Sequence, residues 1–416
     1  MTSKIVVNNI EADAGISTVT FASNISAPTF VGNLNTTSGV ITARTITGVS
    51  TAGITTAYIG SINDGPISGA RNRIINGDMR VDQRNSGVST TVSTTSVGAY
   101  TLDRWNAASA PSLGAATVIR SGTAPVGFTS SLLWTTTTAS GTLTGSQFAC
   151  VNQVIEGYNT SDLSWGTANA KSVTLSFWVR CSLTGTFSGS IRNFAGTRGY
   201  IFTYTINTQN TFEYKTITIP GDTAGTWTID NTGSIQLSFS LGTGPNYSTT
   251  AGSWQAGNLL ATTGETQVIN NLNATWYLTG VQLEAGTVAT PFERRSYGQE
   301  LALCQRYYYR DTYTVVSNVE HFLFYGSMYG TTQLEGVYSF PVEMRSAPTL
   351  GNSALSTFKL RNGAETPTSL AIYGANTRSG LIYTSNTATG TQKQANALMS
   401  ISTNGTVTYL EFNAEL

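Results

Sequence analysis

Apolar and polar residues alternate over several short stretches of the chain. Val173, Leu175, Phe177 and Val179 occupy every second position of one such stretch, and the same period of two recurs in the stretches given at the end of this paragraph. Alternation with a period of two places apolar side chains on one face of a strand and predicts half-buried β-structure. Turn-forming Gly, Asn, Ser and Pro separate the stretches, so we expect a sandwich or jelly roll of many short strands. The further stretches are residues 200–204, 214–219, 234–241 and 275–283.

The last hundred residues show the same kind of pattern on a smaller scale. Residues 322–340 are aromatic and β-prone, and short strands are predicted at 369–373, 381–384 and 407–412. We interpret this part as a second, smaller all-β domain. Nearer the other end, residues 71–81 predict strand, turn and strand, because Asn-Gly and Gly-Asp pairs form turns.

One short stretch has the period of a helix. Between Glu293 and Arg310, the residues Tyr297, Leu301, Cys304 and Tyr308 fall at i, i+4, i+7 and i+11, which gives one apolar stripe. Two partners for this stripe stay open at this point. It packs either on the domain that carries it or on copies of itself in a trimer.

The first 65 residues differ from the rest, because they contain no Trp and only weak apolar runs. A loose repeat of Gly, a β-branched residue and Ser or Thr occurs, for example from Gly39 to Thr42 and from Gly48 to Thr51. One copy cannot bury enough apolar surface to fold alone. The segment is either a flexible linker or a fibrous β-repeat shaft whose core several chains share. The Val, Ile and Thr content favours the shaft, since flexible linkers lack β-branched residues.

These patterns divide the chain of 416 residues into four parts. We predict a shaft and attachment segment over residues 1–65 and a jelly-roll domain over residues 66–292. A short helical linker over 293–311 and a C-terminal β-sandwich tip over 312–416 follow. The fold class is therefore all-β.

Composition excludes several classes of partner. Charged residues make up 11% of the chain and the formal net charge is +0, without any run of Lys and Arg. A neutral chain of this kind has no electrostatic attraction for nucleic acid or for an anionic membrane surface. No stretch approaches the roughly 20 apolar residues that a spanning helix needs, so we expect no membrane insertion. Residues 1–5 lack a signal-peptide core, so we expect synthesis in a cytoplasm.

Groups that carry catalysis are scarce. His321 is the single histidine, and the chain has no Gly-x-Ser-x-Gly elbow, phosphate-binding loop or dinucleotide fingerprint. Three widely spaced cysteines are interpreted as buried thiols rather than as a zinc site or disulfides. Two carboxylates suffice for glycoside hydrolysis, and Glu156, Glu284 and Glu293 are nominal candidates. We nevertheless predict that the protein is not an enzyme.

Aromatic and amide residues offer a binding role instead. If Phe177 faces the core, Trp178 and Arg180 face outward, and with Tyr204 they predict an open surface on which sugar rings stack. The alternative is that Trp178 packs under a loop or a neighbouring chain. Oxygen ligands at Asn76 and Asp78 predict a weak calcium site, although a turn explains the same residues. No other cofactor is expected.

Several blocks along the chain resemble a module of phage tail-fibre proteins, and the N-terminal repeats resemble the shafts of marine cyanophage fibres. The strongest block is residues 279–286, which continues into residues 289–295. In related calcium-binding jelly rolls an Asp often precedes the apolar pair of the last strand, whereas this chain has Gly280 there. The other blocks are residues 72–84, 100–105, 175–180, 214–222 and 300–308.

The resemblance implies a jelly roll similar to carbohydrate-binding modules, carried on a homotrimeric fibre. Such a virion protein is made in the host cytoplasm. It joins tail or baseplate proteins through its N-terminus and contacts a host-surface glycan or protein through its C-terminal domains. Two alternatives remain open, a structural or decoration fibre that binds no receptor and a glycan depolymerase. The resemblance assigns no sugar-binding residue.

Overall fold

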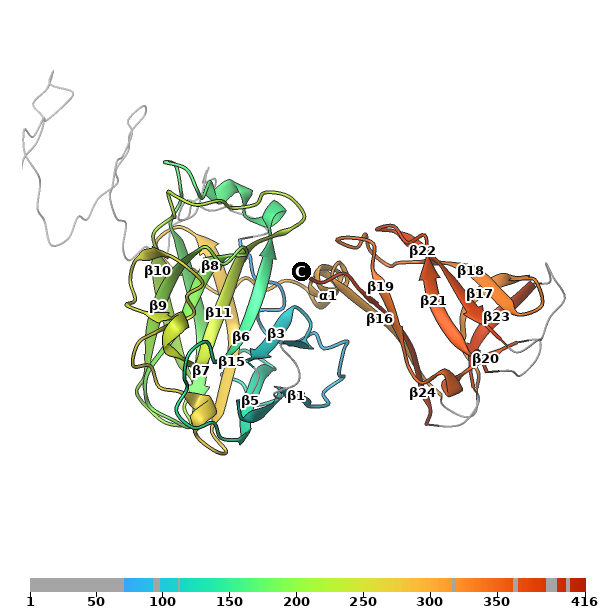
Figure 1. The fold of residues 1–416 in the computed structure, drawn as a ribbon, viewed down its shortest axis with the longest axis horizontal. Helices are drawn as coiled ribbons and strands as arrows, with labels where there is room; N and C mark the ends of the chain where they lie inside the picture. Colours follow the sequence, from blue (N-terminus) through green and yellow to red (C-terminus); the bar gives the residue numbers. More distant parts are fainter. Residues whose placement is uncertain are drawn as a thin grey trace, which may run out of the picture. The chain divides into compact units, whose positions relative to one another are not determined.

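The protein is all-β in the computed structural model, which describes residues 71–92, 98–110, 113–315, 319–361, 366–386, 395–401 and 405–416. All of these belong to the unit Ile59–Leu416 (Figure 1). The predicted shaft, residues 1–65, lies outside the described residues. Strands form two sandwiches, each with its own hydrophobic core.

The first sandwich is the predicted jelly roll, and it consists of two antiparallel sheets. Its six-stranded sheet has the order β1 (Thr90–Val92), β4 (Ala115–Ser121), β5 (Ser131–Thr138), β15 (Thr275–Ala285), β7 (Val173–Cys181) and β10 (Glu213–Ile219). Its seven-stranded sheet has the order β13 (Trp254–Ala256), β9 (Arg198–Ile206), β8 (Gly185–Asn193), β11 (Gly233–Thr243), β6 (Phe148–Glu156), β3 (Trp105–Ser109) and β2 (Ala99–Leu102). The two-stranded pair β12 (Ser248–Thr249) and β14 (Ala261–Thr262) and the 3₁₀ turns η1 (Gly157–Asn159), η2 (Ser161–Leu163), η3 (Pro245–Tyr247) and η4 (Val268–Asn270) complete it.

Aromatic rings from both sheets fill the core of the first sandwich. Phe177 of β7 meets Phe239 of β11 edge to face, with ring centres 5.0 Å apart, and Tyr204 of β9 at 5.2 Å. The indole of Trp276 in β15 donates to the Tyr204 hydroxyl at 3.3 Å, which satisfies both polar groups inside an apolar core. The alternation of β7 and β11 thus faces inward as the sequence predicts.

Residues 71–81 do not form the predicted strand, turn and strand. Their backbone is irregular and is held by side chains instead of a ladder. Ile75 exchanges two hydrogen bonds with the amide of Gln153, at 2.9 and 2.8 Å. The Asn72 amide oxygen accepts from the N–H groups of Ile74 and Leu283. Amide side chains therefore replace the strand partner that the prediction assumed.

The one α-helix of the described residues, α1 (Tyr297–Gln305), is shorter than the predicted linker over 293–311. Ser296 and Gln299 form a capping box at its start. Cys304 is buried and packs with Leu301 against residues of the segment before the sandwich, whereas Tyr297 is exposed and Tyr308 belongs to a strand. The helix therefore packs on its own chain, and only part of the predicted stripe is buried.

The second sandwich begins at Tyr308, inside the predicted linker rather than at residue 312. Its three-stranded sheet has the order β16 (Tyr308–Thr314), β24 (Val407–Asn413) and β19 (Thr349–Asn352). Its six-stranded sheet has the order β20 (Phe358–Leu360), β23 (Ala395–Ser400), β17 (Phe322–Tyr329), β18 (Gln333–Ser339), β22 (Ser379–Ser385) and β21 (Ser369–Tyr373), with the turn η5 (Leu355–Thr357) before β20. Leu334, Ile382, Leu398 and Phe412 are fully buried in its core.

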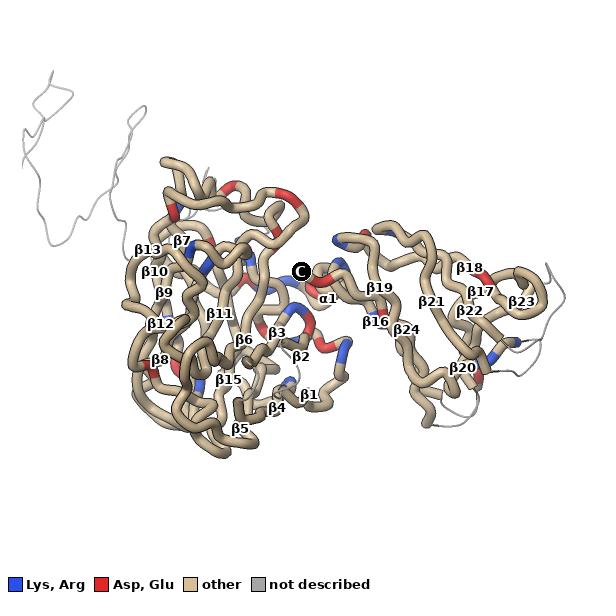
Figure 2. The backbone as a smooth tube through the Cα atoms, in the orientation of Figure 1, with Lys and Arg blue, Asp and Glu red and all other residues tan. Residues whose placement is uncertain are grey.

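Charged residues are sparse along the backbone of both sandwiches (Figure 2). Many of them join segments far apart in sequence, such as Arg84 with Glu415 and Arg198 with Asp222. Within the described ranges, no helix has the length and apolar character needed to span a bilayer.

Candidate functional site

Strand register brings a row of polar side chains together on the outer face of the seven-stranded sheet. Ser238 of β11 lies opposite Ser190 of β8 on one side and Asn152 of β6 on the other. Asn152 lies opposite Asn106 of β3, and Asn106 lies opposite Tyr100 of β2. Paired residues of antiparallel strands share a face, so the row crosses five strands. The core residues alternate with these positions, and the row therefore faces away from the core.

A second row runs beside the first one. Arg192 of β8 pairs in register with Gln236 of β11, which in turn lies opposite Val154 of β6. Nη2 of Arg192 donates to the Gln236 side-chain oxygen at 2.8 Å. On the other side of the first row, Cys150 lies opposite Ala108. The floor of this face thus combines amides, one guanidinium and small apolar groups.

The chain between β11 and β15 covers one part of this face. Strand β13 adds to the edge of the sheet beside β9, and the backbone N–H of Thr262 donates to the Ser188 hydroxyl at 3.0 Å. The carboxylate of Glu265 accepts from the hydroxyls of Ser188 and Ser240. This covering segment, residues 244–265, leaves the rows around Asn152 and Arg192 as an open groove.

The groove has a volume of about 260 Å³. Phe194 lines the groove, and 47% of its surface is exposed. Tyr247 and Phe148 also line the groove and pack edge to face, with ring centres 5.8 Å apart. The Asn106 and Asn152 side chains share only a long contact of 3.5 Å, so both keep hydrogen-bonding capacity for a ligand. The lining consists of Tyr100, Asn106, Ala108, Phe148, Cys150, Asn152, Val154, Arg192, Phe194, Gln236, Tyr247, Asn258, Leu260 and Leu416.

Two groups in the groove floor, Tyr100 and Cys150, are neutral near pH 7 because burial raises their pKa values. Burial, aided by Glu415, raises the pKa of Tyr100 to about 12, and burial raises the pKa of the Cys150 thiol to about 11. Among the described residues, no three His, Cys, Asp or Glu side chains gather closely enough to hold a metal ion. Hydrogen bonding, ring stacking and one positive charge are therefore what the groove offers to a ligand.

The residues predicted as a sugar-binding surface do not share one face. Trp178 and Arg180 lie half-buried on the outer face of the six-stranded sheet, where Trp178 packs on Tyr214 with ring centres 5.3 Å apart. Tyr204 is buried in the core of the sandwich, stacked on Phe187. The prediction that these three residues form one surface was wrong, because the alternation along a strand does not reveal which sheet the strand belongs to.

Both residues of the predicted calcium site have protein partners in the structure. The Asn76 amide is fully used, since its oxygen accepts from Val81 N–H at 2.9 Å and its nitrogen donates to the carbonyls of Val81 and Asp103. Asp78 forms an ion pair with Arg80. These hydrogen bonds and this ion pair account for both side chains without a cation.

The nominal catalytic carboxylates are occupied by structural contacts. Glu156 binds Arg306, Glu284 binds Thr290 and lies 3.6 Å from Arg71, and Glu293 accepts from the backbone N–H of Asn72 at 2.7 Å. His321 stacks on Tyr313, with ring centres 5.0 Å apart. The three cysteines are free and buried, as the sequence predicts.

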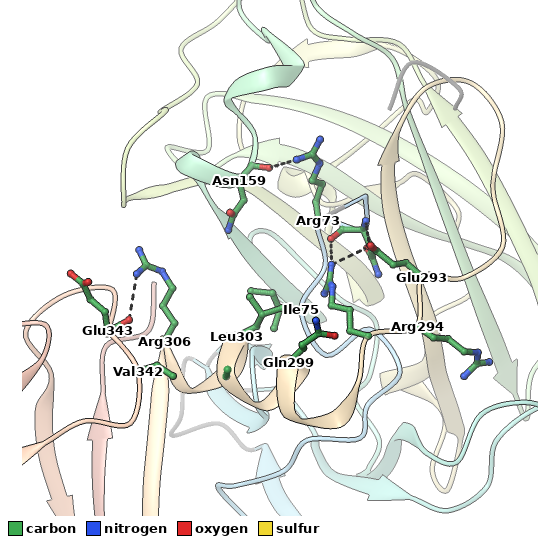
Figure 3. A pocket seen from close by; sticks show the side chains of 13 residues that line it. Arg73, Ile75, Asn159, Glu293, Arg294, Gln299, Leu303, Arg306, Val342 and Glu343 are labelled. Atoms are coloured by element: carbon green, nitrogen blue, oxygen red, sulfur yellow. Dashed lines mark hydrogen bonds and ion pairs between the residues drawn. The ribbon is translucent and has the colours of Figure 1, made fainter. Parts of the chain in front are cut away.

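A larger cavity of about 720 Å³ lies beside α1, and three of the four arginines that line it pair with carboxylates (Figure 3). Arg73 points toward Asn159 and pairs with Asp162, while Arg306 pairs with Glu156 and reaches the Glu343 carbonyl. Apolar side chains such as Leu303 form the rest of the wall. These contacts hold the segments around the helix together, so we assign this cavity a structural role.

Exposed aromatic residues also lie on the six-stranded sheet of the second sandwich. Tyr325, Tyr329 and Tyr373 are each more than half exposed. Phe322 stacks on Tyr325, with ring centres 5.0 Å apart. Among the cavities described here, none is lined by these side chains, so the surface does not define the shape of a ligand.

The sequence contains a signal for some of the groove residues, although we did not predict them as a site. Alternation over 234–241 assigns Gln236, Ser238 and Ser240 to the face opposite the core. Which neighbouring strands align their polar positions with these three depends on sheet order. The run of polar outward positions on β8 and β11 was the signal that could have indicated this face.

Comparisons with known proteins give structural similarity only. No family model matches the chain, and no curated protein matches it. The enzymatically active domain of tailspike protein 4 from bacteriophage CBA120 is 14% identical with a TM-score of 0.28, over 52% of this chain and 21% of that one. A family 11 carbohydrate-binding module from Clostridium thermocellum, in complex with a β-1,3-1,4-mixed-linked tetrasaccharide, is 12% identical with a TM-score of 0.25, over 47% of this chain and 99% of that one.

A third similar structure is TmCBM61 in complex with β-1,4-galactotriose, which is 10% identical with a TM-score of 0.26, over 52% of this chain and 99% of that one. The chain spans about a fifth of the tailspike chain and nearly the whole length of both modules. Identities and TM-scores this low carry no functional assignment, so the function is argued from the groove itself.

Proposed function

We propose that this chain is a glycan-binding adhesin that holds a host-surface carbohydrate in the groove on the seven-stranded sheet of its first sandwich. One observation carries the proposal, namely the aligned row of Asn106, Asn152 and Tyr100 beneath an exposed Phe194. Sugar rings present hydroxyl edges to amides and C–H faces to aromatic rings, and the groove offers both kinds of surface.

The groove also has the form of a pre-built binding site. Its floor is made by strands rather than by loops, so ladder hydrogen bonds fix the spacing of Asn106, Asn152 and Gln236. Ligand sites with a few fixed polar groups between aromatic walls cost little ordering on binding. The protein acts in this proposal by binding, without converting the glycan.

The wider role that we propose is that of a homotrimeric tail fibre of a virion, attached through its N-terminal segment to tail or baseplate proteins. The resemblance of residues 279–295 to tail-fibre modules supports it, together with the repeats of the first 65 residues. Sedimentation equilibrium of the full chain tests the trimer directly. A monomer at micromolar concentration would contradict the fibre and leave the groove untouched.

The glycan proposal is tested by binding of the purified full chain to a printed glycan array and to host cells. We expect saturable binding that the Asn106→Ala and Asn152→Ala variants each weaken by about fivefold, since one hydrogen bond contributes about 1 kcal/mol. Tyr373→Ala, at an exposed position of the second sandwich, is the matched control. Absence of binding to every glycan and to host cells would contradict the proposal and favour a structural fibre.

A further inference from the structure

Arg192 in the groove is sheltered without an anionic partner, a property that it shares with Arg180 on the other sheet of the first sandwich. Its Nε atom is buried and has no hydrogen-bond partner among the described residues. Among the described residues, its side chain donates one hydrogen bond, from Nη2 to the neutral Gln236 side chain. No carboxylate of the described chain forms an ion pair with it. Burying a cation without a counter-charge is costly, so this arrangement needs a reason.

Two other partly buried arginines of this chain, Arg198 and Arg306, follow the opposite pattern. Arg198 has a raised pKa because Asp222 binds its side chain, and Arg306 has a raised pKa because Glu156 does the same. Burial instead lowers the pKa of Arg192, and the groups that oppose this shift are Cys150 and Tyr247 rather than a carboxylate. The chain thus supplies counter-ions at these other positions but not in the groove.

The position of Arg192 is also that of a ligand contact. It lines the groove in the row beside the Asn152 row, together with Phe194 and Gln236. Glu265, a carboxyl group on the covering segment, is occupied by Ser188 and Ser240 rather than by Arg192. An anion that enters the groove therefore meets a guanidinium that no carboxylate side chain of the described residues pairs with, while the main-chain oxygen of Leu416 in the same groove accepts from the Tyr100 hydroxyl at 3.0 Å.

We propose that the groove selects a glycan with an anionic substituent, a uronic acid carboxylate or a sulfate ester, and that Arg192 is the residue that binds this group. This inference rests on the proposed glycan binding and narrows it to acidic sugars. Planar oxyanions of carboxylates and the oxygens of sulfate both match the fork of N–H donors on a guanidinium. The amides of Asn106 and Asn152 then hold the neutral hydroxyls of the same or the next sugar.

The experiment compares matched polymers that differ only in charge. Isothermal titration of the full chain is carried out with polygalacturonate and its carboxyl-reduced form, and with a sulfated galactan and its desulfated form. We expect at least one acidic polymer to bind about 10- to 100-fold more tightly than its neutral partner, because a hydrogen bond to a charged group contributes roughly tenfold or more in affinity. The pair that shows the difference distinguishes carboxylate from sulfate.

Variants assign the effect to the residue. Arg192→Gln should abolish the preference, so that the acidic and the neutral polymer bind with similar affinity, and Arg192→Lys should keep part of the preference. Arg180→Gln, on the outer face of the other sheet, is the matched control and should change nothing. Thermal unfolding of each variant checks that the sandwich is intact, and measurable binding of the neutral polymer checks that the groove is still formed.

The outcomes separate the two proposals. Equal affinity for acidic and neutral forms, or binding to neutral polymers alone, overturns the role of Arg192 and leaves glycan binding standing. A preference for acidic polymers that survives in Arg192→Gln overturns the assignment of that residue. No binding to these polymers or to any member of a glycan array overturns the proposed function and the inference together.

Discussion

Arg306 holds Glu156 in a two-pronged ion pair, with 2.9 Å between Nε and Oε2 and 2.5 Å between Nη2 and Oε1. Glu156 is the last residue of β6 in the first sandwich, and Arg306 follows α1 directly before the second. Tyr307 adds an O–H donated to Oε2 at 2.6 Å. The bidentate geometry fixes the course of the chain where it leaves α1 for β16.

Removing the guanidinium should therefore destabilise the protein strongly. In Arg306→Met the Glu156 carboxylate, whose side chain is 1% exposed, keeps only Tyr307 as a donor. An uncompensated buried charge costs about 3 kcal/mol or more, so the free energy of unfolding should fall by that amount. Urea unfolding followed by tryptophan fluorescence measures it.

The exposed ion pair of Arg378 and Glu343 provides the control. Its two side chains are 79% and 51% exposed. Arg378→Met should change the free energy of unfolding by less than about 0.5 kcal/mol, since solvent screens such pairs. Equal effects of the two substitutions would show that the Glu156 contact contributes no more than a surface pair.

Much of the fold was predictable because each strand carries its own pattern. The predicted stretch 369–373 coincides with β21 (Ser369–Tyr373), and residues 173–180 fall within β7. The prediction for residues 71–81 failed because the side chains of Asn72 and Gln153 form hydrogen bonds with the backbone of this segment. These hydrogen bonds depend on contacts with distant strands. Local pattern reveals a strand, but it does not reveal its partner.

The candidate site depends on relations that the sequence does not encode locally. Asn106 and Ser238 are far apart in the chain and share a row only through the sheet order β11, β6, β3. Tyr204 was also misplaced. We predicted an exposed side chain there, but Tyr204 is buried in the core, on a strand of the other sheet. Choosing between faces required the order and register of the strands.

Gly280 lies at a bulge of β15 that only glycine fits. Its φ is +62°, and an added Cβ would lie 2.7 Å from Phe128 Cζ and 3.1 Å from Trp178 Cδ1. Gly280→Ala should lower the free energy of unfolding by about 2 kcal/mol, from backbone strain and displaced rings. Chemical denaturation of the full chain measures the change.

Gly298 in α1 provides the matched control for the substitution of Gly280. An added Cβ there meets nothing within 4 Å. Gly298→Ala should stabilise by up to about 1 kcal/mol, because alanine favours a helix over glycine. A destabilising effect at Gly298, or a neutral one at Gly280, would contradict the geometry described for these positions.

Two aromatic residues distinguish the groove from the surface predicted by the sequence. Phe194→Ala should weaken glycan binding by about three- to tenfold, since ring stacking contributes about 1 kcal/mol. Trp178→Phe should leave the affinity unchanged, because Trp178 lies on the outer face of the other sheet. Titration with the same glycan measures both. The opposite ranking would move the site to the six-stranded sheet.

Glu265 should make stability depend on pH in a defined window. Burial raises the pKa of its carboxyl from the ordinary 4.5 to about 7, against hydrogen bonds from Ser188 and Ser240 that lower it. The folded state therefore holds the proton more tightly than the unfolded state does. The resulting stabilisation is complete below about pH 4.5 and is lost as the pH rises to about 7.

Replacement by glutamine removes that dependence, since the amide does not titrate. From pH 5 to pH 8 the free energy of unfolding of the unmodified chain should fall by about 2 kcal/mol more than that of Glu265→Gln. Urea unfolding at the two pH values measures the difference. Identical pH profiles would mean that the carboxyl is solvated, and that residues 244–265 do not seal it against the sheet beside the groove.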